Sequence, residues 1–251
     1  MASREEIVSH CDELLAISDF EDYGPNGLQV PGASEVSTVA TGVSANLATL
    51  RGAMDVGAQL VLTHHGLFWE FLPRALTPQM TERLRTLLEA DASLAAYHLP
   101  LDAHPEVGNN ALLCEGLGFE RSEPFGEAKG APIGFVGRAE PVPIGKLTSR
   151  VTDLVGREPL LQGAGPDAVG SIGVVSGAGA DAVHEAVALG LDALLTGEPA
   201  EHAMADATEG GLHLIAAGHY ATETLGIRRL GELLAERFGV EHRFVDVPNP
   251  V

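Results

Sequence analysis

The chain is expected to fold as an α/β protein with two similar lobes that arose by internal duplication, each a mixed or parallel sheet flanked by helices. Short apolar, β-branched runs alternate with helical patterns, which is typical of strand–helix–strand units. The same succession occurs over 37–63 and over 171–196, and Gly57 and Gly190 lie at matching positions before the closing strand of each copy. Such units normally form right-handed crossovers between parallel strands.

The first lobe is expected to begin with a helix that precedes the repeated unit. Apolar β-branched runs predict its strands, and periodic apolar residues predict its helices. The expected elements are a helix at 4–17, a strand at 37–43, a helix at 45–56, a strand at 59–63, a strand at 93–98 and a helix at 110–117.

The second lobe repeats this order after a Gly- and Pro-rich stretch at 121–165, which is expected to hold a linker and the opening strands of this lobe, one of them at 133–138. The remaining elements are expected as strands at 171–176, 192–196, 212–219 and 241–247 and helices at 180–189 and 224–238. We therefore expect domains at 1–122 and 123–251, with the part around 219–247 as a candidate to pack back on the first lobe.

The charge balance excludes some partners. There are 35 acidic and 15 basic residues, which gives a formal charge of −20. This charge repels nucleic acid and anionic membranes, and no basic stripe offsets it. The acid excess, with Lys129 and Lys146 as the only lysines, is typical of a halophilic surface. An ordinary acidic cytosolic protein is the alternative.

The compartment is expected to be the cytoplasm. No apolar run reaches the roughly 18 residues of a membrane span. The first six residues become acidic at once and lack the apolar core of a signal peptide. Cys11 and Cys114 form no CxxC motif and fit free core thiols better than a disulfide framework.

Histidines and carboxylates gather at the predicted strand ends, where parallel sheets bind ligands. His64 and His65 end one strand, and each of the two strands that end in histidine is followed by a carboxylate four positions later. The candidate metal ligands are His64, His65, Asp102, His219 and Glu223. Imidazole and carboxylate together suit zinc, iron or manganese, and carboxylates can bridge two ions.

Other interpretations of these residues stay open. A single strand-end histidine is more often a hydrogen-bonded structural residue than a ligand. The run 177–182 fits G-x-G-x-x-A, but any turn that closes a strand onto a helix can produce it. The sequence contains no phosphate loop and no G-x-S-x-G nucleophile elbow, so nothing supports serine or cysteine nucleophile chemistry.

Several motifs in order resemble the Nif-three-like dinuclear metal-centre family, whose members often carry the name GTP cyclohydrolase type 2 homologue. The resemblance covers about 7–247. Its motifs are Asp22–Val30 (DYGPNGLQV), Leu62–Trp69 (LTHHGLFW), His98–Ala103 (HLPLDA), Thr196–Glu198 (TGE) and Gly218–Glu223 (GHYATE).

The resemblance implies two α/β lobes with a two-metal site in the cleft between them and a homohexameric ring. The family's ligands map onto the same five residues, and the short stretch between the lobes matches the family's short form. It implies a site for two divalent transition-metal ions per chain. The family's reaction is less defined, and nucleotide-ring hydrolysis and metal trafficking are both suggested.

Two functions are compatible with these residues and motifs. The first is a metal-dependent hydrolase acting on a small, nucleotide-like substrate, with His98 and Glu198 as proton carriers. The second is a non-catalytic metal carrier or regulatory protein with the same ligands. His98 could instead orient a ligand, and Glu198 could cap a helix. Phe68 and Trp69 could stack on a base, or could belong to the core or a subunit interface.

Overall fold

The computed structural model describes residues 1–251 and divides into two compact units. Unit 1 comprises Met1–Leu101 and Gly226–Val247, and unit 2 comprises Asp102–Leu225 and Pro248–Val251. The boundary therefore lies before Asp102, whereas the sequence pattern placed it at 122/123. The C-terminal segment joins unit 1 because β13 (Glu241–Phe244) pairs in parallel with β4 (Thr38–Ser44).

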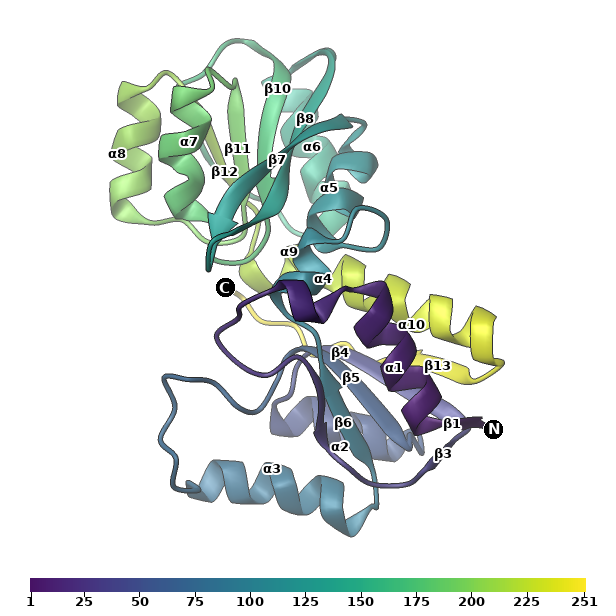
Figure 1. The fold of residues 1–251 in the computed structure, drawn as a ribbon. Coiled ribbons are helices and arrows are strands. Elements are labelled where there is room, and N and C mark those ends of the chain that lie inside the picture. Colours follow the sequence, from purple (N-terminus) through teal and green to yellow (C-terminus); the bar gives the residue numbers. More distant parts are fainter. The chain divides into compact units, whose positions relative to one another are not determined.

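Unit 1 is built on a five-stranded sheet in the order β13-β4-β5-β6-β2, in which only β2 is antiparallel to its neighbour. Figure 1 shows α2 and α3 on one side of this sheet and α1 and α10 on the other. The other elements are β1 (Ala2–Ser3), α1 (Arg4–Leu14), η1 (Ile17–Asp19), β2 (Gly27–Val30), β3 (Glu35–Val36), α2 (Leu47–Asp55), β5 (Leu60–His65), α3 (Pro78–Glu89), β6 (Ser93–Ala96) and α10 (Thr224–Phe238).

The core of unit 1 fills the space between the sheet and α2 and α3. Leu50 and Ala53 of α2 pack with Leu87 of α3 and with Val61 and Leu94 of the central strands, and all five are fully buried. Asn46 caps α2 and Thr77 caps α3, each accepting a backbone N–H of the first turn. The core and caps fix the strand ends that carry the histidines.

Unit 2 is built on a six-stranded sheet in the order β7-β8-β10-β11-β12-β9. Helices α7 and α8 lie on one side of it, and α5 and α6 lie on the other (Figure 1). Its elements are α4 (Leu99–Ala103, entered from unit 1), α5 (Asn109–Leu117), β7 (Glu120–Ala128), β8 (Ala131–Pro143), α6 (Ile144–Val155), β9 (Leu160–Gln162), β10 (Ala168–Val175), η2 (Ala180–Ala182), α7 (Val183–Ala188), β11 (Ala193–Thr196), α8 (Glu201–Glu209), β12 (His213–Ala216) and α9 (His219–Thr222).

The stretch at 121–165 is more ordered than a linker. Strands β7 and β8 form a long antiparallel hairpin, and α6 follows it. Lys129 and Gly130 both have positive φ, which is the backbone of the tight hairpin turn that matches the twist of the strands. The high Gly and Pro content of this region therefore reflects turns and an edge strand, not an open connection.

The two units share a strand arrangement. In unit 1, β4, β5 and β6 are parallel and the edge strand β2 is antiparallel to β6. In unit 2, β10, β11 and β12 are parallel and the edge strand β9 is antiparallel to β12. This mixed α/β class with sheets flanked by helices agrees with the prediction from sequence, while the origin of the two units by duplication stays a hypothesis.

Two further expectations concern the core thiols and membrane spans. Cys11 and Cys114 are free and buried, as predicted, and burial raises the pKa of each thiol to about 12. No helix combines the length and apolar character that crossing a membrane requires.

Candidate metal centre

Three histidines meet at the carboxyl ends of neighbouring strands in unit 1. His64 and His65 end β5, which lies between β4 and β6, and His98 follows β6. His64 is fully buried, while His65 and His98 are half-buried. One ring nitrogen from each of the three lies within 4.8 Å of the others, so this triplet could hold a metal ion.

Each of these imidazoles has its Nδ1 atom in a hydrogen bond with the protein. His64 Nδ1 lies 3.0 Å from the backbone oxygen of Tyr97. Because a carbonyl oxygen only accepts, His64 carries its proton on Nδ1 and has a lone pair on Nε2. His98 Nδ1 lies 2.7 Å from Asp22 Oδ1, and His65 Nδ1 lies 3.1 Å from Ser44 Oγ. Metal-binding histidines typically use their second nitrogen in this way.

Asp22 holds His98 in place. Its side chain is 3% exposed and also accepts hydrogen bonds from the Tyr23 N–H, the Leu99 N–H and the Asn26 amide. Burial alone would raise the pKa of Asp22, but its hydrogen bond to His98 and the remaining donors outweigh burial and lower it. The side-chain oxygen of Asn26 in turn accepts a hydrogen bond from the backbone N–H of His98 at 2.8 Å.

Sequence reasoning did not assign a role to Asp22. The signal available was its place at the head of the DYGPNGLQV motif, which the resemblance used only as a signature. Asp22 and His98 are distant in the sequence, so only the fold shows that the carboxylate and the imidazole form a pair.

Unit 2 places His219 between two carboxylates. His219 opens α9 directly after β12, and its Nδ1 lies 2.5 Å from Glu198 Oε1. Its Nε2 lies 3.0 Å from Oε1 of Glu223, whose side chain is 3% exposed. Burial lowers the pKa of His219, but the hydrogen bonds and charges of Glu223 and Glu198 outweigh it and raise the pKa to about 9.

Gly177 forms the floor beneath His219 and Glu223. A Cβ atom at Gly177 would lie 2.3 Å from Glu223 Oε1 and 3.3 Å from His219 Nε2. Its φ of +61° also disfavours any other residue. The Gly177 carbonyl accepts the N–H groups of Gly197 and Glu198, each at 2.9 Å, which ties the end of β11 to this turn. The positions of His219 and Glu223 therefore require a glycine at residue 177.

Asp102 is buried in the same unit. Its Oδ1 accepts hydrogen bonds from Asn109 Nδ2 at 2.8 Å and from Ser176 Oγ at 3.0 Å. Ser176 immediately precedes Gly177, so the segment that positions Asp102 continues into the turn beneath Glu223. A buried carboxylate held by neutral donors keeps lone pairs available for a cation.

The predicted site residues thus form two groups. Unit 1 brings His64, His65 and His98 together, and unit 2 positions Asp102, His219, Glu223 and Glu198. Glu198 does not cap a helix, because α8 begins at Glu201 after Ala200, and it pairs with His219 instead. Imidazole nitrogens and carboxylate oxygens are donors that fit divalent transition metals. The chemistry of the donor sets therefore fits metal binding.

The chain matches known proteins over its whole length. A family model described as Duf34/NIF3 (NGG1p interacting factor 3) matches residues 2–250. A relative from Pseudomonas aeruginosa named GTP cyclohydrolase 1 type 2 homolog is 43% identical, with 97% of both chains covered. A relative of the same name from Escherichia coli K12 is 40% identical, with 98% of both chains covered.

Solved structures agree with this assignment. A structure named protein ybgI, of unknown function, aligns with a TM-score of 0.94 and 40% identity over 100% of both chains. A crystal structure from Thermus thermophilus aligns with a TM-score of 0.91 and 35% identity, again over 100% of both chains. Full-length matches in both sequence and structure show that the chain is a member of the Duf34/NIF3 family.

Proposed function

We propose that the protein binds two divalent transition-metal ions per chain, zinc, iron or manganese, and hydrolyses a small nucleotide-like substrate. The proposed ligands are the five residues predicted from the sequence: His64, His65, Asp102, His219 and Glu223. The observation that carries the proposal is the shared hydrogen bonding of His64, His65 and His98, each engaged through Nδ1. The name of the relatives, GTP cyclohydrolase 1 type 2 homolog, supports the reaction class.

Bound divalent ions supply Lewis acidity and lower the pKa of water to about neutral. The residues of the chain supply orientation and proton transfer. The Tyr97 carbonyl fixes the tautomer of His64, and Asp22 fixes that of His98. His98 then presents Nε2 as the atom that accepts and returns a proton. In unit 2, Glu198 is the second proton carrier, and its carboxylate lies against Nδ1 of His219.

The experiment that tests the reaction is turnover of guanine nucleotides by protein loaded with zinc, iron or manganese, with products identified by mass spectrometry. His98→Ala and Glu198→Ala are expected to lose at least about 100-fold in kcat and to retain metal. His184→Ala is a matched control, because this histidine is 69% exposed and pairs with Asp206 in unit 2. Turnover that persists after complete chelation would contradict the proposal.

His98 has a second possible role, which the same variant resolves. Its ring nitrogen lies within ligand distance of those of His64 and His65. If His98→Ala loses metal together with activity, His98 is a ligand. If metal content is unchanged and activity is lost, it carries a proton.

The alternative function is a metal carrier or regulatory protein. One observation favours it: Cys11 and Cys114 are buried with strongly raised pKa values, so no thiolate joins the donor sets. Imidazole and carboxylate ligands hold zinc less tightly than thiolates and favour exchange. Metal that passes to a weak chelator within minutes, without turnover of any nucleotide tested, would support the carrier.

We also propose that the protein is a cytoplasmic homohexamer that binds neither nucleic acid nor membranes. The family resemblance supports the hexamer, and the charge of −20 disfavours anionic partners. Mass by light scattering is expected to be six times 26.2 kDa. A monomeric mass across the micromolar range would contradict the ring.

The acidic surface supports a halophilic protein. Screening by salt weakens repulsion among like charges. The free energy of unfolding in urea is therefore expected to rise by at least about 1 kcal/mol between low and molar KCl. Equal stability at both salt concentrations would indicate an ordinary acidic protein.

A further inference from the structure

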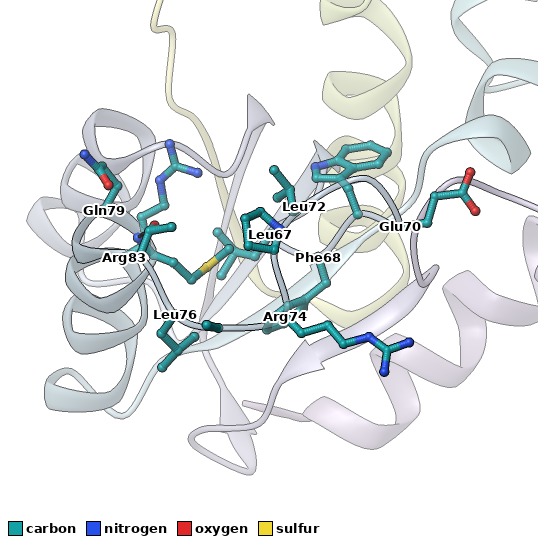
Figure 2. Close-up of a pocket in the computed structure, with 13 residues that line it drawn as sticks. Leu67, Phe68, Glu70, Leu72, Arg74, Leu76, Gln79 and Arg83 are labelled. Carbon is teal, nitrogen blue, oxygen red and sulfur yellow. Dashed lines mark hydrogen bonds between the residues drawn. The ribbon is translucent and has the colours of Figure 1, made fainter.

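Unit 1 contains a cavity that the proposed ligands do not line. It lies between α3 and the loop that follows β5, and its volume is about 440 Å³, within the range of small-molecule sites. The lining is mostly apolar, with Leu67, Leu72, Pro73, Leu76 and Met80 among its side chains (Figure 2). A cavity of this size and character can enclose the apolar part of a small ligand.

The loop that closes the cavity is unusually apolar for exposed chain. Phe68, Phe71, Leu72 and Leu76 are all exposed, Phe71 by 70% and Leu76 by 61%. Clustered exposed apolar side chains mark interaction sites more often than single ones do. The start of the loop is fixed, because Gln29 Oε1 accepts the Leu67 N–H and the Tyr23 carbonyl accepts the Glu70 N–H. The cavity is therefore anchored to the same segments that hold the histidines.

A cation without an internal partner lies at the cavity. Arg83 of α3 is half-buried and forms no ion pair, while its neighbour Glu82 pairs with Arg51 and Arg85. Figure 2 shows Arg83 projecting from α3 on the same side as Gln79, while Arg74 and Glu70 extend away from the helix. In a chain with a net charge of −20, an unpaired, half-buried guanidinium beside an apolar cavity indicates an anionic ligand.

The apolar lining also limits the class of ligand. The hydrogen-bonding side chains of the lining include Glu70, Thr77 and Gln79. The leucine, proline and methionine side chains that form much of the wall offer no N–H or O–H group to the edges of a nucleobase. An alkyl or aryl group needs none. We propose that this cavity binds a small organic acid, with an apolar body among Leu67, Leu72 and Leu76 and its oxyanion on Arg83.

Trp69 connects this cavity to the histidine cluster. Its ring lines the cavity and lies 5.0 Å from the His98 ring and 6.0 Å from the His65 ring, measured between centroids. An acid in the cavity is therefore separated from the histidines by one side chain. Binding does not depend on the proposed metal or reaction, and Trp69, the only tryptophan, reports it directly.

The test measures energy transfer from Trp69 to two naphthalene probes bound to the full chain. The anionic probe is 8-anilinonaphthalene-1-sulfonate, and N-phenyl-1-naphthylamine is its uncharged analogue. Arg83→Gln is expected to weaken binding of the anionic probe about tenfold and binding of the uncharged probe less than twofold. Arg85→Gln, on the same helix but exposed and paired with Glu82, is the control and should change neither.

A second variant and a competition complete the test. Leu76→Asp changes an exposed side chain, so it should fold and should abolish binding of both probes. Octanoate should displace the anionic probe at lower concentration than guanosine monophosphate does. The proposal would be overturned if Arg83→Gln bound the anionic probe as tightly as the wild type, or if the nucleotide displaced the probe more strongly than octanoate. It would also be overturned if binding appeared only after oligomers dissociate, because a second copy would then cover the cavity.

Discussion

The histidines after β6 and β12, His98 and His219, occupy corresponding strand ends in the two units, and a carboxylate holds Nδ1 of each. The surroundings differ. His98 lies among two further imidazoles and pairs with the almost fully buried Asp22. His219 lies between two carboxylates, and its partner Glu198 is 36% exposed. Equivalent backbone positions therefore carry neutral donors in unit 1 and anionic donors in unit 2.

This difference separates what topology determines from what side chains determine. The parallel strand order brings the carboxyl ends of β5 and β6 in unit 1, and of β11 and β12 in unit 2, to one edge of each sheet. The neighbouring residues then set the charge: His64 and His65 follow Thr63 in β5, whereas Gly197 and Glu198 follow Thr196 in β11. Divalent ions need both ligand atoms and compensating negative charge, and under the proposed function unit 2 supplies most of that charge.

The largest expected loss of stability comes from a substitution at Gly177, which lies against Glu223 and His219 in unit 2. Gly177→Ala adds a methyl group at a positive φ and against Glu223 Oε1. Gly190→Ala is the matched control, since Gly190 also has a positive φ but nothing within 4 Å of its Cβ position. We expect Gly190→Ala to cost about 1 kcal/mol and Gly177→Ala about 3 kcal/mol in urea unfolding. Equal costs would show that Glu223 moves aside freely.

The next effect compares the two carboxylates that hold Nδ1. Asp22→Asn turns one acceptor oxygen into an amide group facing buried donors, so we expect a loss of about 2 kcal/mol. Glu198→Gln can still accept from His219 and is partly exposed, so its cost should stay below about 1 kcal/mol. Thermal unfolding of both variants measures the difference. A larger loss in Glu198→Gln would reverse the comparison.

A further expected effect is a pH dependence of stability that arises in unit 2. His219 has a folded pKa of about 9, above its unfolded value of about 6.5. Its protonation therefore stabilises metal-free protein fully below about pH 6.5, and this stabilisation is lost as the pH rises through about 9.

Urea unfolding of chelated protein between pH 6.5 and 9.5 checks this sign. The free energy of unfolding is expected to fall with pH in the wild type and to fall less in His219→Gln. His184→Gln, which changes an exposed histidine of the same unit, should retain the wild-type slope. An unchanged slope in His219→Gln would contradict the raised pKa.

Local sequence patterns predicted much of the fold. Apolar periodicity identified β4, β5, β6, β10, β11 and β12 within a few residues, because buried parallel strands leave a strong local signal. In the stretch at 121–165, the sequence pattern predicted a strand at 133–138, which lies within β8, but it did not identify β7 or α6, since turn-rich composition also resembles a linker. Two predicted strands were also too long at their C-terminal ends, because His98 and His219 follow β6 and β12 and are not part of them.

The candidate site was predictable in its residues but not in its contacts. His64, His65 and His219 stood out because they follow apolar runs. Asp22 did not, because its role depends on a hydrogen bond to His98 across the fold. Glu198 was left between helix capping and proton transfer, and its contact with His219 is a tertiary one. Contacts between residues that are distant in the sequence leave no periodic pattern in it, so sequence patterns could not predict them.

The central claim is metal binding by the five proposed ligands, and elemental analysis tests it most directly. Protein purified without chelator, and protein loaded with zinc, iron or manganese, would be measured by inductively coupled plasma mass spectrometry. We predict about two ions per wild-type chain, about one or fewer in His64→Ala and in His219→Ala, and wild-type content in His184→Ala. Wild-type protein that holds no metal after loading, or variants that retain it in full, would contradict the account.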